Sequence, residues 1–364
     1  MGGGTETSTL ELINQFDDSV EITVCYFYNK HDLLDKFKKA NCKLIYLNLP
    51  GSYSFPTGIR ELYKLVRNEK YDLMVTSLYR ASMISRFVSL ITKVPLVDTM
   101  VNDSYGIGKR KEFKGAHIIK FWMVYLLDRV TSFVPKLWIS NSKFLSLQLG
   151  RQLAIDSRKI EVIYRGRDIT KIIEWLPPEN ILPFHIVSIG RLFVQKAQDD
   201  LIKSFAMFHK KYPESTLTIY GEGPQRNYLE KLINELQLQN IVQLPGRVQE
   251  AWRQLYKAHC FVLPSSYEGF SGALVEAVVS GIPIVASDIP MNLEAVSDNI
   301  NGQIYPVGNI EQLFNKLCST YENYKGAIEQ GKNARNMGLI QYDLKLISRN
   351  YQNLLMQFQN SNKI

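Results

Sequence analysis

Short apolar runs rich in β-branched and aromatic residues alternate with longer segments whose apolar residues recur every three or four positions. The first pattern is typical of buried strands, and the second is typical of amphipathic helices. In the first half of the chain, strands are predicted at Val20–Tyr28, Lys43–Leu47, Leu73–Ser77, Pro95–Val101, Leu137–Ser140 and Ile160–Tyr164. Helices are predicted between them, at His31–Ala40, Thr57–Asn68, Arg80–Thr92 and Ala116–Phe133. This alternation predicts a parallel sheet with helices on both faces.

The alternation stops at residues 165–183, where Trp175-Leu176-Pro177-Pro178 predicts a linker between domains, and then it starts again. In the second half, strands are predicted at His185–Gly190, Thr216–Tyr220, Val242–Leu244, Cys260–Leu263, Ile282–Ala286 and Gln303–Tyr305. A mostly helical tail begins at Ile310 and ends in the helix Lys345–Phe358. We therefore expect two doubly wound α/β domains, with a ligand at the carboxyl ends of their strands.

The charge balance is modestly basic. The chain has 364 residues, with 43 Lys and Arg against 35 Asp and Glu and a formal net charge of +8. This excess favours anionic partners such as a nucleotide sugar or a phospholipid surface, and it is too small to indicate nucleic-acid binding. The four cysteines lack metal-ligand spacing, which indicates buried thiols in a reducing compartment. Without a signal-peptide pattern or an apolar run of about 18 residues, we expect a cytoplasmic protein that does not span a membrane.

Two glutamates flank a turn that leads into an apolar helix. Glu268 precedes the turn, and Glu276 lies in the second turn of the helix that follows. Free backbone N–H groups at the start of that helix would form an anion site between two carboxylates that can accept bonds from hydroxyls. An ionised Glu276 among apolar neighbours is costly unless it is paired or reaches a cleft, which favours a function over a solvated charge. The pattern suits a nucleoside diphosphate sugar.

Two cations, Arg191 and Lys196, follow the predicted strand His185–Gly190. At the end of a strand both could reach a ligand, the arginine as a bidentate fork and the lysine as a point charge. Together they would neutralise a diphosphate leaving group as its charge grows. The alternative is that each is a solvated surface charge.

Two further turns follow predicted strands. Gly221-Glu222-Gly223-Pro224 suits a tight turn with proline at the first position of a helix. Pro245-Gly246-Arg247-Val248 could place backbone groups against a nucleobase. Either motif taken alone is equally consistent with a plain turn.

In combination, these motifs resemble the C-terminal domain of the family 4 retaining glycosyltransferases of the GT-B fold. The resemblance covers the whole chain in arrangement and is densest from residue 187 to residue 306; the paired glutamates with the upstream Arg and Lys are its specific part. It implies two Rossmann-like domains that face a cleft. Residues 1–168 would bind the acceptor, residues 169–342 would bind the nucleotide sugar, and the helix within 343–364 would cross back to the first domain.

The resemblance also implies roles for individual residues. Arg191 and Lys196 would bind the donor diphosphate and act in catalysis with Glu268, which would lie beside the donor sugar. Glu276 would hold the ribose hydroxyls. Further donor contacts would come from Gly269, Phe270, Ser271, Gly272, Ala273, Leu274, Gly221, Arg247, Val248, Gly3 and Gly4.

Two features depart from the family pattern. The family has a strand before its N-terminal glycine loop, whereas this chain starts at the loop; we expect a weakened first sheet and a reading frame that begins upstream or a truncated chain. Asn102 takes the place of a histidine that the family commonly carries near the reacting sugar, and asparagine cannot become cationic. Arg165 and Arg167 complete the predicted acceptor side; contact with the donor and surface charges near a hinge are the alternatives.

The segment 109–136 combines seven basic residues with two acidic ones and with interleaved aromatic and aliphatic residues. It could lie on an anionic bilayer and present the site to a lipid-linked acceptor. A packed helix with solvated ends is the alternative.

These observations predict a retaining transferase that moves a sugar from a UDP- or GDP-linked donor to a hydroxyl of a glycan or lipid-linked acceptor, in cell-surface polysaccharide or glycolipid synthesis. No Asp-x-Asp triplet occurs, so we expect neither a metal ion nor another cofactor. We expect the protein in the cytoplasm, peripheral on the inner face of the cell membrane. The alternatives are a sugar-nucleotide epimerase or phosphorylase on the same fold, or a non-catalytic protein that binds nucleotide sugars.

Overall fold

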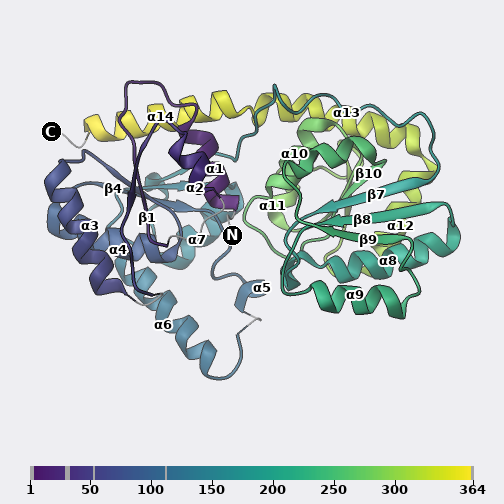
Figure 1. Cartoon of the computed structure of the whole chain (residues 1–364), viewed down its shortest axis with the longest axis horizontal. Coiled ribbons are helices and arrows are strands. Elements are labelled where there is room, and N and C mark those ends of the chain that lie inside the picture. The colour runs from purple at the N-terminus through teal and green to yellow at the C-terminus, as the bar shows by residue number, and fades with distance from the viewer. Residues whose placement is uncertain (1–3, 29–32, 52–53, 111–112, 362–364) are drawn as a thin grey trace. The chain divides into compact units, whose positions relative to one another are not determined.

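The computed structural model describes residues 4–28, 33–51, 54–110 and 113–361, and the chain divides into two compact units (Figure 1). The first unit comprises the chain up to Gly166 together with the segment from Leu344 onward. The second unit is Arg167–Asp343. The boundaries expected from the sequence, after residues 168 and 342, lie within two residues of these positions.

The first unit alternates strands and helices. Its strands are β1 (Thr23–Tyr26), β2 (Lys43–Tyr46), β3 (Met74–Thr76), β4 (Leu96–Met100), β5 (Leu137–Ser140) and β6 (Ile160–Val162). Its helices are α1 (Gly4–Ile13), α2 (Leu34–Lys38), α3 (Phe55–Glu69), α4 (Tyr79–Thr92), α5 (Ile107–Arg110), α6 (Ala116–Thr131), α7 (Lys143–Leu153) and α14 (Leu344–Ser361). A 3₁₀ turn, Ser157–Lys159, precedes β6.

The strands of the first unit form two parallel sheets instead of one continuous sheet. β1 pairs with β2, and β3, β4, β5 and β6 pair in that order. In the part of the chain that the structure describes, β1 and β3 share no ladder. Apolar packing joins the two sheets instead, because Ile45 from β2 and Met74 from β3 belong to the same core cluster as Val66 of α3 and Val88 of α4.

The C-terminal helix α14 packs within the first unit. Tyr351, Leu354 and Phe358 lie against the core of β4 and β5. At the same helix, Gln352 Nε2 donates to Asp17 Oδ1 over 2.6 Å, and Gln352 Oε1 accepts from the backbone N–H of Asp17 at 3.1 Å. The apolar face of α14 therefore packs on residues far away in the sequence, in the sheet that contains β4 and β5.

The second unit holds one six-stranded parallel sheet in the order β12-β11-β10-β7-β8-β9. Its strands are β7 (Phe184–Ile189), β8 (Ser215–Tyr220), β9 (Val242–Gly246), β10 (Cys260–Leu263), β11 (Ile284–Ser287) and β12 (Gln303–Tyr305). Its helices are α8 (Gln198–Lys211), α9 (Arg226–Glu235), α10 (Gly272–Ser280), α11 (Pro290–Leu293), α12 (Ile310–Glu322) and α13 (Tyr324–Gln341). Short 3₁₀ segments occupy Val194–Lys196 and Ala251–Lys257.

The segment predicted as a linker is docked on the second unit. Trp175 is 3% exposed, its backbone N–H donates to the Ser280 carbonyl oxygen at 2.7 Å, and its indole N–H donates to the Ala258 carbonyl oxygen at 3.0 Å. Ile172 is also buried. The residues after Arg167 thus belong to the core of the second unit and do not form a loose connection.

Two histidines join β7 to the loop before β10. His259 Nδ1 accepts from the backbone N–H of His185 at 2.9 Å, and His259 Nε2 lies 2.9 Å from the Asn180 carbonyl oxygen, so the ring is neutral with its proton on Nε2. Burial lowers the pKa of His185 to about 4, helped by the nearby His259. Burial also lowers the pKa of His259. Both rings are therefore held in the neutral form.

We expect the free energy of unfolding to fall as the pH drops from about 6.5 to about 4. In this window the unfolded chain binds protons at His185 and His259 while the folded chain does not, so the stability present above the unfolded pKa is lost. The shift of the His185 pKa corresponds to a loss of about 3 kcal/mol, measured by urea unfolding at several pH values. His185→Gln should reduce this dependence, whereas His117→Gln, at an exposed site, should retain it.

Candidate functional site

Four loops of the second unit meet at one edge of its sheet. β10, β7, β8 and β9 are neighbouring parallel strands, so the loops that follow them lie side by side at the carboxyl ends. Lys196 follows β7, Gly221 follows β8, Arg247 follows β9 and Glu268 follows β10. The parallel sheet therefore brings together predicted donor residues that are widely separated in the sequence.

Lys196 and Glu268 form an ion pair at this edge. Each side chain is only 13% exposed, and the Ser265 hydroxyl donates to Glu268 Oε1 at 2.9 Å. The two loops are also joined through the backbone, where the N–H of Ser266 donates to the carbonyl oxygen of Gln195 at 2.8 Å. Lys196, predicted as a cation for a diphosphate, thus neutralises one of the two predicted carboxylates.

Arg191 has a different environment from Lys196. Its side chain is exposed, and its guanidinium lies over the ring of Phe193, 4.8 Å from the ring centroid. The Arg191 carbonyl oxygen accepts from Gln198 Nε2 at 3.0 Å, which holds the loop against the start of α8. The planar guanidinium is therefore positioned by stacking, and its edge faces solvent, where an anion can reach it.

The second carboxylate, Glu276, also pairs with a cation. Arg167 Nε donates to Glu276 Oε1 at 2.8 Å, with 10% and 15% of the two side chains exposed. The backbone fixes Arg167, because its N–H donates to the Tyr342 carbonyl oxygen at 2.8 Å and it bridges to Asp343. Arg167, predicted on the acceptor side with donor contact as an alternative, belongs to the second unit, where it pairs with the predicted donor residue Glu276.

The N-terminus of α10 lies between the two glutamates in the sequence. Ser271 occupies the N-cap position, but its side chain accepts no bond from the first turn of the helix. The first intrahelical bond of this turn runs from the Val275 N–H to the Ser271 carbonyl oxygen, so the N–H groups of residues 272–274 precede the helical ladder. Phe270 is buried against Tyr342 and anchors the preceding turn. Backbone donors at a helix N-terminus are suited to bind phosphate oxygens.

Close packing between loops explains the two glycines of the turn Gly221-Glu222-Gly223-Pro224. Gly221 has a φ of +151°, and a Cβ there would lie 1.9 Å from the Gly190 carbonyl oxygen. A Cβ on Gly223 would lie 2.3 Å from the Leu192 carbonyl oxygen. The Leu192 N–H also donates to the Glu222 carbonyl oxygen at 3.0 Å. The two glycines thus allow the loop after β8 to contact the loop that carries the cations, which is a structural role.

The remaining predicted residues of the second unit lie at the end of β9. Arg247 is exposed and Val248 is half-buried. The preceding Gly246 has a φ of +88°, and the Gly221 N–H donates to its carbonyl oxygen at 2.9 Å. These residues therefore border the same loop edge without being buried in it.

The predicted acceptor residues lie in the first unit, apart from Arg167. Asn102 is exposed in the loop after β4. A Cβ built on Gly4, the first residue of α1, would lie 3.4 Å from Arg165 Nη1, so this arginine lies beside the start of that helix. Gly3 lies outside the described residues.

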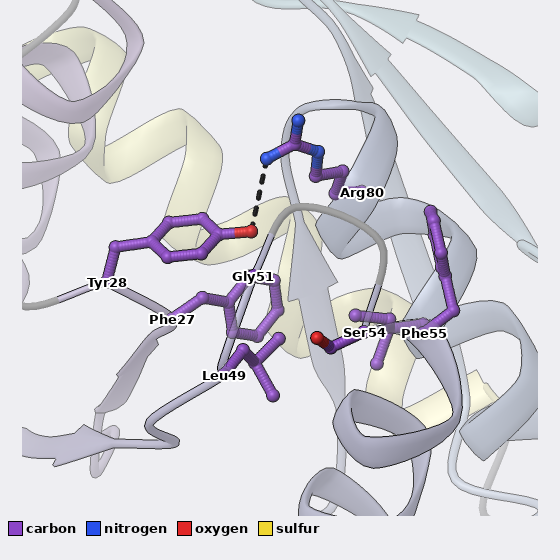
Figure 2. A pocket seen from close by; sticks show the side chains of 8 residues that line it. Phe27, Tyr28, Leu49, Gly51, Ser54, Phe55 and Arg80 are labelled. Atoms are coloured by element: carbon purple, nitrogen blue, oxygen red, sulfur yellow. Dashed lines mark hydrogen bonds between the residues drawn. The ribbon is translucent and has the colours of Figure 1, made fainter.

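A small pocket of the first unit contains residues that sequence analysis did not single out. Figure 2 shows Tyr28 and Arg80 pointing toward each other above Phe27 and Phe55, and Arg80 Nη1 donates to the Tyr28 hydroxyl at 3.1 Å. The pocket volume is about 10 Å³, roughly the space that one water molecule needs and far too little for a sugar. Arg80 follows the predicted strand Leu73–Ser77, so its position could have identified it, whereas Tyr28 was the last residue of the predicted strand Val20–Tyr28 and follows β1 only because the observed strand ends at Tyr26.

In the described ranges, no three His, Cys, Asp or Glu side chains are grouped closely enough to hold a metal ion. At this edge of the sheet, Arg191, Lys196, Arg247 and the N-terminus of α10 are groups that can bind an anion.

Two family models match consecutive parts of the chain. The model described as Glycosyltransferase Family 4 matches residues 2–171, and the model described as Glycosyl transferases group 1 matches residues 177–337. Together they cover both structural units.

Curated relatives include glycosyltransferases from archaea and bacteria. An uncharacterized glycosyltransferase of Methanocaldococcus jannaschii is 38% identical over 127 residues, which are 34% of this chain and 31% of that protein. The chain thus matches only about a third of the length of this relative. The UDP-Gal:alpha-D-GlcNAc-diphosphoundecaprenol alpha-1,3-galactosyltransferase of Escherichia coli is 26% identical over 288 residues, which are 76% of this chain and 72% of that protein.

A solved structure resembles the whole chain. Anabaena Alr3699/HepE in complex with UDP has a TM-score of 0.81 at 20% identity, over 98% of this chain and 96% of that chain. This likeness confirms the predicted fold of two α/β domains with parallel sheets, as in GT-B glycosyltransferases.

Gly221→Ala should destabilise the second unit by about 3 kcal/mol, because a Cβ would overlap the Gly190 carbonyl oxygen at a positive φ. Gly308→Ala is the matched control: its φ is +74°, but no atom lies within 4 Å of the added Cβ. That control should cost only about 1 kcal/mol. Urea unfolding measures both; equal losses would show that the contact between the loops is unimportant.

Proposed function

Because the chain belongs to the family 4 glycosyltransferases, we propose that it moves a sugar from a UDP- or GDP-linked donor to a hydroxyl of a glycan or lipid-linked acceptor. We propose further that transfer retains the anomeric configuration and needs no metal ion. One observation carries the proposal: two half-buried cation–carboxylate pairs, Lys196–Glu268 and Arg167–Glu276, are built on the elements at both ends of the uncapped N-terminal turn of α10.

The donor would bind through its diphosphate and its ribose. The N–H groups of the first turn of α10 and the exposed guanidinium of Arg191 would hold the phosphate oxygens. Glu276 would accept hydrogen bonds from the ribose hydroxyls. Arg167 would keep that carboxylate ionised and oriented, since the backbone of residues 342 and 343 holds the arginine in place.

The catalytic effect would come from Lys196. When the bond between the sugar and the diphosphate breaks, negative charge grows on the leaving oxygen and positive charge grows on the sugar ring. Lys196 would stabilise the leaving group, and Glu268, held by Ser265, would stabilise the ring from beside the sugar. The acceptor hydroxyl would attack from the face that the diphosphate leaves and pass its proton to the departing phosphate oxygen. Glu268 is not assigned as a covalent nucleophile.

The first unit would bind the acceptor. The Escherichia coli relative acts, by its name, on a diphosphoundecaprenol-linked sugar, which supports a lipid-linked acceptor here. Asn102 and Arg165 follow strands of this unit, and Arg80 with Tyr28 adds a cation and a hydroxyl at the ends of β3 and β1. A lipid-linked acceptor places the protein in the cytoplasm at the inner face of the membrane, in polysaccharide or glycolipid synthesis.

Glu276→Ala should weaken the binding of the UDP- or GDP-sugar about tenfold or more, and Lys196→Ala should lower kcat about a hundredfold. Isothermal titration with nucleotide sugars measures the first effect, and steady-state transfer measures the second. Lys203→Ala is the matched control, because Lys203 forms an ion pair with Asp199 on α8. Full binding and turnover in both site variants would show that the site lies elsewhere.

Transfer should continue in excess EDTA, and the product should carry the anomeric configuration of the donor. The product is analysed by NMR, with and without acceptor and with inorganic phosphate in place of acceptor. Restoration of activity by Mg²⁺ after EDTA would contradict metal independence, and an inverted product would contradict retention. Turnover that needs no acceptor, or that needs phosphate, would indicate an epimerase or a phosphorylase.

A further inference from the structure

Helix α6 has an apolar face that nothing in the described structure covers. Seven large apolar residues recur at helical spacing along this face and are between 40% and 67% exposed: Ile119, Trp122, Met123, Leu126, Leu127, Val130 and, just after the helix, Phe133. We call this set the α6 stripe. Exposed apolar residues are common singly, whereas a continuous row on one helix marks an interaction surface.

The opposite face of α6 is firmly packed. Phe121 is buried, and Tyr125 donates from its hydroxyl to the Gln152 carbonyl oxygen at 2.8 Å. Asp128 accepts from Arg86 Nη1 at 2.7 Å and from the Tyr105 hydroxyl at 2.6 Å. Arg86 is 2% exposed and also bonds to Asp98 at 2.9 Å. These buried polar contacts fix the rotation of α6 about its own axis. The α6 stripe, on the opposite face, is therefore exposed.

Helix α4 extends the same surface. Arg86 of α4 bonds to Asp128 and Thr131 of α6, so the two helices lie side by side in the first unit. Three apolar residues of α4 are also exposed, namely Phe87, Leu90 and Ile91. Figure 1 shows α6 along the outside of the first unit, with its N-terminal end projecting beyond the other elements in this view.

Basic side chains surround the α6 stripe. The exposed ones are Lys93, Arg110, Lys114, Lys120, Arg129 and Lys136. Arg110 lies over the Trp122 ring, 5.6 Å from its centroid. Between residues 113 and 136 the only acidic residue is Asp128, which is buried in its pair with Arg86. The surface is therefore apolar at its centre and positive at its edges.

We propose that the α6 stripe lies in the interfacial region of an anionic phospholipid bilayer. Apolar side chains would enter the boundary between headgroups and acyl chains, and the basic side chains would contact anionic headgroups. Trp122 with Arg110 suits this boundary, because the indole is amphipathic and the guanidinium stays hydrated. No helix in the described residues is long and apolar enough to cross a bilayer. Contact through a helix face is the mode that this surface supports.

The charge around the α6 stripe favours an anionic bilayer over a second copy of the chain as the partner of this surface. A pair of α6 stripes facing each other would bring four exposed cations of one copy (Lys114, Lys120, Arg129 and Lys136) close to the same four of the other, with no exposed acid between residues 113 and 136 to offset them. An anionic lipid surface offsets all of them. The inference deepens the proposed function, since it names the surface that would carry a lipid-linked acceptor, but it stands on the first unit alone.

The test measures binding of the purified full chain to phosphatidylcholine vesicles with and without phosphatidylglycerol. Wild type should sediment with the anionic vesicles, and more weakly at high salt. The double substitution Met123→Glu and Leu126→Glu, at exposed positions that a folded chain tolerates, should lower binding about tenfold or more. The matched control on α13, Met337→Glu with Ile340→Glu, also changes exposed apolar residues and should bind like wild type.

A conservative variant gives a second readout. Trp138 and Trp175 are buried, and Trp252 is half-buried in the second unit, whereas α6 belongs to the first. A blue shift of tryptophan emission on adding anionic vesicles should therefore come largely from Trp122 and should be lost in Trp122→Phe. Glu276→Ala should bind vesicles normally, which separates this proposal from the proposed function. The proposal would be overturned if the double variant bound vesicles like wild type, or if the α13 control lost binding equally. It would also be overturned if wild type bound no vesicles and formed a dimer that the double variant converted to a monomer.

Discussion

The pairing of half-buried carboxylates with cations is the interaction on which the candidate site depends. Removing an ionised group from water is costly unless an opposite charge and further hydrogen bonds compensate it. Glu268 meets this requirement through Lys196 and Ser265, and Glu276 meets it through Arg167. Each pair joins segments distant in the sequence, so the site forms only when the second unit has folded. A ligand anion can take the place of a carboxylate at its cation, and ligand hydroxyls can then donate to the freed carboxylate.

The same principle organises the first unit, where Arg86 stands between Asp98 and Asp128. Burial raises the pKa of Asp98, while Arg86 and Ser82 oppose this effect. Losing one member would leave a buried charge without its partner, so this cluster holds α4, β4 and α6 in a single arrangement. That arrangement is what exposes an apolar helix face, even though burying the same face would have favoured folding.

The two units differ in how completely their sheets are paired. In the second unit, six strands form one sheet, and the loops of this unit that were predicted to bind the donor lie at its carboxyl edge. In the first unit the strands are divided between two sheets that a common apolar cluster joins. Ladder hydrogen bonds position loops more rigidly than apolar packing alone, because they are directional. The sheet of the second unit is thus the more completely paired one, and the first unit relies more on side-chain packing.

The sequence by itself determined the order and type of most elements, because apolar periodicity reflects which side chains must be buried. The strands Leu137–Ser140, Cys260–Leu263 and Gln303–Tyr305 were predicted with their observed bounds, and Arg191, Lys196, Glu268 and Glu276 could be singled out by their positions after strands or inside an apolar helix. Only the tertiary structure decided the partner of each charge and the face of each helix that is covered. In the tertiary structure Arg167 pairs with Glu276, the strands of the first unit form two sheets, and the α6 stripe is exposed. These outcomes depend on contacts between segments far apart in the chain, and local periodicity carries no information about such contacts.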